Sequence, residues 1–221
     1  MSPARSVDVD RVRVSSRQVV DVTVRTLRTR GLPYAAARAA ADVVEELEAV
    51  DASGLRALAA ALQRPVVEPT VTDAGLDAHG AGGLLVVEAG VDLLCLSGAV
   101  DIADVGEPYA LLSALRRVVD DRGGSWCARW SDADGSAPGG CAVSADGSAC
   151  CWGGTPTPHR PAAATHTVRI HAGHPVEHAV RLPDAASALV AARESGLVVD
   201  HDHWGPLAAA AQAFLVDVPA D

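Results

Sequence analysis

Three histidines and a glutamate near the C-terminus form the densest group of chemically active side chains in the sequence. The group reads His171-x-x-His174-x-x-x-His178, with Glu177 beside the last histidine. Imidazole titrates near neutral pH and is a common zinc ligand. We therefore take His174, His178 and Glu177 as candidate acid–base catalytic residues. The alternative interpretation is an exposed or structural turn.

The spacing of this group differs from the helical zinc motif His-Glu-x-x-His, in which two histidines share one helix face. Gly173 and Pro175 break any helix here. If the flanking segments pair as a hairpin, His171 and His178 flank it and His174 lies at its tip. We assign no metal ligand, and metal binding by the C-terminal histidines stays a separate hypothesis.

A second polar group reads His201-Asp202-His203-Trp204. Asp200 or Asp202 would sit favourably at a helix N-terminus, where a carboxylate accepts free backbone N–H groups. This pattern fits a functional site. It also fits a polar helix cap followed by a tryptophan that packs into the core.

The five cysteines do not have the spacing of a metal site. Cys150 and Cys151 are adjacent, so alternation along a strand places them on opposite faces of a sheet. Cys127 and Cys141 have no partner at metal-ligand spacing. A nucleophilic Cys–His pair and buried thiols that act as small apolar groups both fit these residues.

The glycine-rich segment Gly80–Gly83 is expected to be a flexible loop that precedes a strand. A phosphate-binding loop has the opposite order, since it follows a strand and opens a helix. All 18 basic residues are arginines, so chemistry based on lysine is excluded. No cofactor is predicted from these patterns.

Charge and hydropathy exclude further classes. The net charge is −10 at neutral pH, which argues against nucleic-acid binding. No apolar run is long enough to span a membrane, and the N-terminus lacks the apolar stretch of a signal peptide. We expect a cytoplasmic protein.

Residues 1–64 are predicted to form a helical lobe. Ser15 and Gln18 fit a capping box at the start of the first helix, and Gly31 fits its end. Pro33 suits the first turn of the second helix, and Pro65 ends a third. The amphipathic faces of this lobe offer a surface for a homo- or hetero-oligomer.

Residues 65–221 are predicted to form an α+β body: an antiparallel, hairpin-rich sheet with C-terminal helices. Asp134-Gly135 and Asp146-Gly147 indicate tight turns between strands. Further helices are expected at 108–120, at 184–194 and from Asp200 to Phe214. Strands are expected at 84–88, 91–96, 125–131, 141–144, 148–152, 165–171 and 177–182.

The helical lobe resembles an uncharacterised bacterial family, the domain-of-unknown-function family three-seven-two-six. The resemblance is carried by the segments Gly31-Leu32-Pro33-Tyr34, Leu47-Glu48-Ala49 and Gly54-Leu55, and by Gly196–Asp200 with Trp204 and Leu207. It implies a bacterial metabolic context.

The N-terminal helices are also similar to those of the type-2 malate/lactate dehydrogenase family, from Val14-Ser15-Ser16 to Leu27 and at Val43-Val44-Glu45. That family's catalytic Asn-His-Phe-Gly stretch has no counterpart, because no histidine lies between His79 and His159. The sequence alone therefore does not indicate a dehydrogenase.

Three functions follow from the sequence. The first is an enzyme or enzyme subunit of hydrolase or lyase type, which acts on a small polar metabolite through His174, His178 and Glu177. The second is a non-catalytic partner or scaffold protein that docks through the helical lobe. The third is metal binding by the C-terminal histidines.

Overall fold

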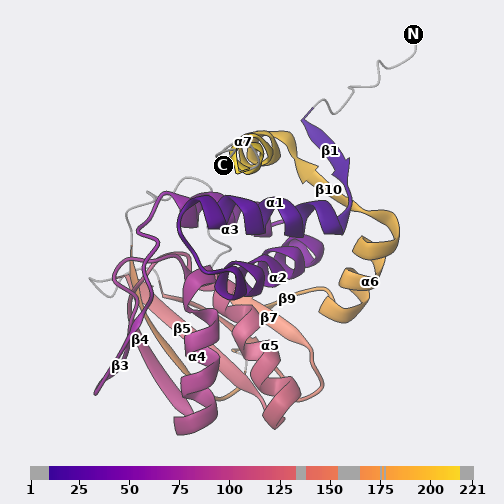
Figure 1. Ribbon diagram of the computed structural model, residues 1–221. Helices are drawn as coiled ribbons and strands as arrows, with labels where there is room; N and C mark the ends of the chain where they lie inside the picture. Colours follow the sequence, from indigo (N-terminus) through magenta and orange to yellow (C-terminus); the bar gives the residue numbers. More distant parts are fainter. Residues whose placement is uncertain (1–9, 133–137, 154–164, 175, 177, 215–221) are drawn as a thin grey trace.

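A layer of helices covers one face of a mixed β-sheet in the computed structural model (Figure 1). The structure describes residues 10–132, 138–153, 165–174, 176 and 178–214. A second, two-stranded sheet joins Arg11–Val14 (β1) to Leu197–Asp200 (β10). The arrangement confirms the expected α+β fold, with N-terminal helices, a largely antiparallel sheet and C-terminal helices.

The three N-terminal helices follow the predicted local signals. They are α1 (Ser16–Thr29), α2 (Tyr34–Asp51) and α3 (Gly54–Leu62). The capping box of Ser15 and Gln18 is present, and Gly31 adopts a φ of +90° just after α1, a conformation that favours glycine.

The C-terminal helices pack on the N-terminal ones. Asp184 caps α6 (Ala185–Ser195), which contacts α2, and Asp200 caps α7 (His201–Ala213), which contacts α1. Much of the apolar surface of the N-terminal helices is therefore covered within the chain, and docking of a partner through them stays a prediction. No described helix is both long and apolar enough to cross a membrane.

The expected hairpin at 84–88 and 91–96 was wrong, since these residues form one helix, α4 (Gly83–Ser97). A nearly continuous apolar run fits a buried strand and a buried helix equally well. Gly90 makes no turn here; it lies inside the helix and faces Ile102.

The large sheet has the strand order β2-β3-β4-β8-β5-β6-β7-β9. Only the β3–β4 pair is parallel among the described strands. The strands of the large sheet are β2 (Thr70–Thr72), β3 (Gly75–Asp77), β4 (Ala99–Val105), β5 (Trp126–Asp132), β6 (Gly139–Val143), β7 (Ala149–Trp152), β8 (His166–Ala172) and β9 (Val180–Arg181).

The meander β5–β6–β7 is as predicted, with Gly147 at a φ of +81° in its second turn. The Asp134-Gly135 turn lies outside the described residues. Strands β2, β3 and β4 were not predicted, because the first two are short and β4 follows α4 directly.

The expected hairpin between 165–171 and 177–182 was also wrong. Strand β8 lies between β4 and β5, whereas the two-residue β9 pairs with β7 at the far edge of the sheet. Strands β5, β6 and β7 therefore lie between β8 and β9 in the sheet. Local alternation predicted the strands but carried no information on their partners.

The sheet has a covered and an open face. Helices α4 and α5 (Leu111–Arg122), the latter preceded by a 3₁₀ turn at Pro108–Ala110, pack on one face over the main core. We call the opposite side the outer face. Among the described residues it carries no helix, only a small cluster of Cys127, Ala142 and Cys150.

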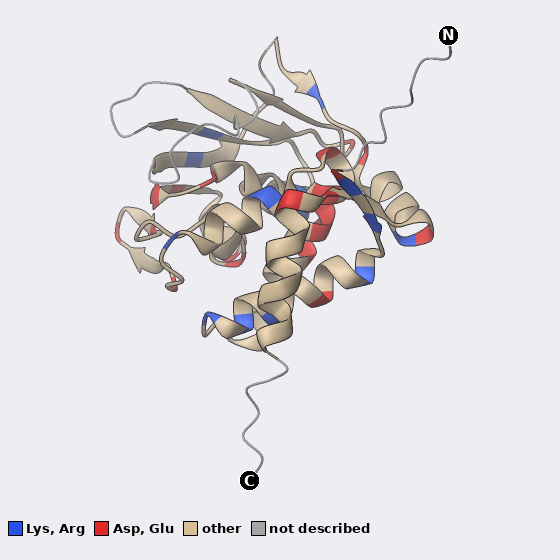
Figure 2. Cartoon of the chain, turned by 90° about the horizontal axis from the view of Figure 1, so that it is seen from above, with Lys and Arg blue, Asp and Glu red and all other residues tan. Residues whose placement is uncertain are grey.

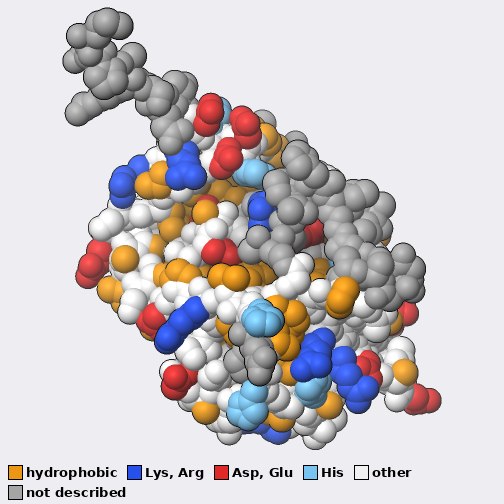
Figure 3. Space-filling model, turned by 180° about the vertical axis from the view of Figure 1, so that it is seen from behind, with side chains coloured by type: hydrophobic (Ala, Val, Ile, Leu, Met, Phe, Trp, Pro, Cys, Tyr) orange, Lys and Arg blue, Asp and Glu red, His pale blue; other side chains and the backbone are white. Residues whose placement is uncertain are grey.

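Two views show how the charged residues are distributed over the molecule. From above, basic and acidic positions are interspersed along the described ribbon (Figure 2). From behind, arginine and histidine side chains lie close together on part of the surface (Figure 3).

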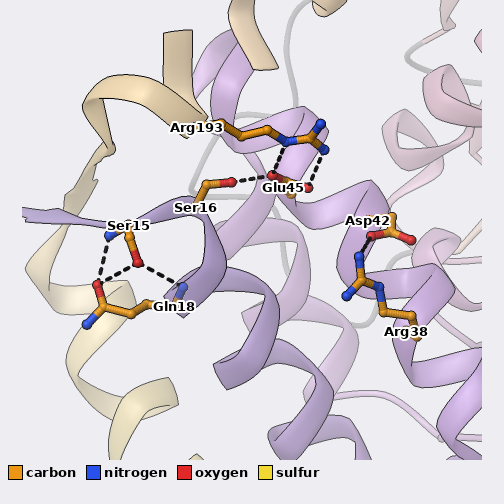
Figure 4. Close-up of polar contacts among 7 residues, drawn as sticks. All are labelled: Ser15, Ser16, Gln18, Arg38, Asp42, Glu45 and Arg193. Carbon is orange, nitrogen blue, oxygen red and sulfur yellow. Dashed lines mark hydrogen bonds and ion pairs between the residues drawn. The ribbon is translucent and has the colours of Figure 1, made fainter. Parts of the chain in front are cut away.

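Four acidic side chains attach α2 to its neighbours. Glu45 accepts hydrogen bonds from Ser16 at the start of α1 and, at 3.1 and 3.2 Å, from Nε and Nη2 of Arg193 on α6 (Figure 4). Glu48 accepts the backbone N–H of Leu55 at 2.9 Å and so caps α3. The other two are Glu46, bonded to Ser113 and Arg116 on α5, and Asp51, bonded to Tyr109 and Ser53.

A glycine sets the approach of α3 to α2. A Cβ atom on Gly54 would lie 2.1 Å from the carbonyl oxygen of Val44, whereas one on Gly90 would lie 3.8 Å from the nearest atom of Ile102. We expect Gly54→Ala to lower the free energy of unfolding by about 3 kcal/mol. The matched Gly90→Ala should raise it by about 0.5–1 kcal/mol, because alanine favours the helix. Urea denaturation of both variants measures this, and equal stabilities would contradict it.

The pKa values of Glu45 and Glu48 are shifted in opposite directions, so we expect pH to affect their contributions to the free energy of unfolding in opposite ways. Burial alone would raise the pKa of Glu45, but hydrogen bonds from Arg193 and Ser16 bring it below its usual value. Its contribution is therefore present above the unfolded pKa of about 4.3 and is lost as the pH falls below that value. Burial raises the pKa of Glu48, so its ionisation costs stability as the pH rises above about 4.3.

We therefore expect Glu45→Gln to destabilise the protein at pH 7 by about 1–3 kcal/mol, since a buried charged acceptor is lost. Glu48→Gln retains an oxygen for the Leu55 N–H and should be at least as stable as the parent at pH 7. Unfolding free energies measured across the acid-to-neutral range test the pair. A large destabilisation by Glu48→Gln alone would reverse the assignment.

Candidate functional site

Two rows of side chains cross the outer face, each made by residues that lie opposite one another on adjacent strands. The first row runs from Ala99 through His171, Cys127, Ala142 and Cys150 to Arg181. The second runs from Asp101 through Arg169, Arg129 and Gly140 to Trp152. The intervening positions, such as Ala128, Val168 and Ile170, are buried against the helices.

Arg129 and Arg169 place two positive charges directly opposite each other on β5 and β8. Like charges in this position repel. Asp101 balances them in part, with Oδ1 at 3.7 Å from Nε of Arg169, but both of these side chains are about half or more exposed. The three side chains together carry a net positive charge on an open surface.

Trp152 lies beside this charge pair. A Cβ atom on Gly140 would come within 2.1 Å of the Trp152 ring, so the half-buried indole lies against the glycine backbone. Gly140 is in turn opposite Arg129. The absence of a side chain at Gly140 therefore leaves room for an aromatic ring in the row that contains Arg129 and Arg169.

His171 and Cys127 meet in the first row. The Cys127 sulfur lies 3.4 Å from Nε2 and 3.7 Å from Nδ1 of the imidazole, and Nδ1 lies 2.7 Å from the Ala172 carbonyl oxygen. Because a carbonyl only accepts, Nδ1 carries the proton in this contact. Burial raises the pKa of Cys127 despite the opposing effect of Arg129. The thiol is thus protonated at neutral pH and is a poor nucleophile.

Two of the three predicted catalytic residues fall within the described part of the chain. His174 and His178 are exposed on the segment between β8 and β9, and Glu177 lies outside the described residues. Ala179, from the same segment, packs on the Cys127 cluster. His178 lies in a turn in which the Ala179 N–H donates to the Val176 carbonyl oxygen at 3.2 Å.

The second histidine group lies elsewhere. His201 and His203 are on α7, which packs against α1 rather than on the sheet, and Nδ1 of His203 is 3.7 Å from a carboxylate oxygen of Asp200 (Figure 1). The two groups therefore do not converge. Within the described part of the chain, no three His, Cys, Asp or Glu side chains gather as a metal site requires.

The expectation for Gly80–Gly83 was wrong in two respects. The segment follows strand β3 and opens helix α4, and residues 81–83 are buried rather than part of a flexible loop. Its N–H groups at Gly80, Ala81 and Gly83 donate to backbone carbonyls, and a Cβ atom on Gly83 would lie 2.4 Å from the Glu107 oxygen. These donors are already used within the fold, so the segment does not fit a bound phosphate.

Arg129, Arg169 and Trp152 were missed by sequence reasoning. Alternation along each strand does place Arg129 on the same face as Cys127, and Arg169 on the same face as His171. What brings the two arginines together is the register of β5 on β8, which joins segments far apart in the sequence.

No protein-family model matches the chain, and neither does any curated protein. The resemblance to the domain-of-unknown-function family is therefore without support from a family model. Several solved structures share the fold at low sequence identity.

A dehydrogenase from Sinorhizobium meliloti superimposes with a TM-score of 0.63 and 14% identity, over 91% of this chain and 99% of that one. Malate dehydrogenase from Pyrococcus horikoshii OT3 gives 0.63 and 9%, over 97% and 99%. Δ1-Piperideine-2-carboxylate reductase from Pseudomonas syringae pvar. tomato gives 0.55 and 12%, over 90% and 99%. The chain thus has the fold of these enzymes, which agrees with the resemblance of its N-terminal helices to type-2 malate/lactate dehydrogenases.

Proposed function

We propose that this chain is a metabolic protein of oxidoreductase type that binds a small carboxylate on its outer face. The observation that carries the proposal is the directly opposed pair Arg129 and Arg169, exposed and only partly balanced by Asp101. A bound carboxylate would relieve their repulsion, and the planar guanidinium group matches a carboxylate with two parallel hydrogen bonds. Trp152 would provide an apolar surface for the rest of the ligand.

The comparisons support the same class of ligand. Malate and piperideine-2-carboxylate, which the names of two similar structures specify, are both small carboxylates. The names dehydrogenase and reductase also favour oxidoreductase chemistry over the hydrolase or lyase type expected from the sequence. Such names imply a hydride-carrying cofactor. The buried segment Gly80–Gly83 does not fit a cofactor's phosphates, and we derive no step through one.

Within this proposal, imidazole groups around the outer face would move the proton. His171 lies on the face itself, and His174, His178 and Glu177 belong to the segment that follows it. Cysteine chemistry is not favoured, because burial keeps the Cys127 thiol protonated.

We expect malate, used as the probe, to bind in isothermal titration calorimetry. Arg129→Gln and Arg169→Gln should each weaken its binding about 10-fold or more, because each removes a hydrogen bond between charged groups. Arg122→Gln, an exposed arginine on α5 on the other side of the sheet, is the matched control and should bind like the parent. Equal affinities in all three variants would refute the site.

If His174 and His178 are acid–base groups, His174→Ala and His178→Ala should each lower the rate of malate oxidation, with a nicotinamide dinucleotide added as the hydride acceptor, by about 100-fold. The melting temperature should not change, since both side chains are exposed. His201→Ala, also exposed but on α7, is the control. Product analysis under identical conditions compares the three rates, and equal rates would remove both histidines from the mechanism.

A further inference from the structure

A groove of about 280 Å³ lies between α2 and α4, on a part of the molecule distinct from the outer face. The segment that links α3 to β2 forms its third side. The walls are apolar, and include Leu32, Ala36, Ala40, Val66, Leu84 and Val87. The alanine side chains of α2 are small and so leave this space open. The facing residues of α4, Leu84 and Val87, are buried.

The rim of the groove carries charges of both signs. Arg30 lies at the end of α1, Glu68 lies on the linking segment, and Glu88 lies on α4. Glu88 is paired with Arg117. The side chains of Arg30 and Glu68 are exposed, and neither has an ion pair or hydrogen bond with the other or with another described residue. One free positive and one free negative group therefore border the same apolar space.

The size and chemistry of the groove restrict its occupant. An α-helix is about 10–12 Å across with its side chains, too wide for a space of this volume. The volume is close to the lower limit of about 300 Å³ for ligand pockets. Apolar walls disfavour a simple ion, and two unpaired charges of opposite sign disfavour a purely apolar molecule.

We propose that this groove binds a free α-amino acid with an apolar side chain. Arg30 would hold the carboxylate, Glu68 the ammonium group, and the alanine-lined walls the side chain. The proposal concerns a second ligand and a second site, and it does not depend on carboxylate binding at the outer face.

Three probes separate the contributions in titrations of the full chain. Leucine carries both charges, leucinamide lacks the carboxylate, and 4-methylpentanoate lacks the ammonium group. We expect saturable binding of leucine, and affinities about 10-fold lower for each analogue, because each loses a charged hydrogen bond. No binding of leucine at millimolar concentration, or equal binding of all three, would overturn the proposal.

Variants then assign the residues. Arg30→Gln should abolish the preference for leucine over leucinamide, and Glu68→Gln the preference over 4-methylpentanoate. Ala39→Leu should fill the groove and remove leucine binding, whereas Ala35→Leu, exposed on the same helix and outside the groove, should not. Leucine binding that survives Ala39→Leu would place it elsewhere and overturn the proposal.

A last variant keeps this site separate from the outer face. Combined Arg129→Gln and Arg169→Gln substitutions should leave leucine affinity unchanged. If they abolish it, leucine binds at the arginine pair and the groove proposal fails, while the outer-face proposal stands.

Discussion

Four acidic side chains of α2, each buried or partly buried, are the constraint on which the arrangement of helices depends. A carboxylate removed from water is costly unless a partner is placed to meet it. Glu45, Glu46, Glu48 and Asp51 each find that partner on a different element, namely α1 and α6, α5, α3 and the turn before α5. Apolar packing would hold these helices together as well, but it would not select a single position along α2 for each of them.

Close backbone contacts fix the junction between the helices and the sheet in the same way. Gly83 donates to the Gly106 carbonyl, and Gly106 donates to Ala81, so the start of α4 is bonded directly to the end of β4. A Cβ atom on Gly83 would lie 2.4 Å from the Glu107 carbonyl oxygen, and one on Gly106 would meet the Arg64 side chain. The glycines of the segment Gly80–Gly83 resemble a phosphate-binding loop in the sequence, but in the structure they allow close packing between backbone segments. The N–H groups of Gly80 and Gly83 are used in bonds to backbone carbonyls within the fold.

Features set by neighbouring residues were predictable from the sequence, and features set by distant ones were not. The capping box at Ser15, the helix end at Gly31 and the turn at Gly147 depend on local hydrogen bonds and on φ alone. The apolar run of α4 was misread, because its pattern has no period that separates helix from strand. The candidate site was missed for a different reason: Arg129 and Arg169 become neighbours only through the register of β5 and β8.

The small residues of β6 and β7 determine which chemistry the outer face can offer. Gly140 makes room for Trp152, and Ala142 and Cys150 form a small apolar cluster with Cys127 on this face. Burial raises the pKa of the Cys127 and Cys150 thiols, so they stay protonated and act as small apolar side chains. Polar reactivity on this face is thereby left to guanidinium and imidazole groups. Their positions in turn depend on the strand register that these small residues allow.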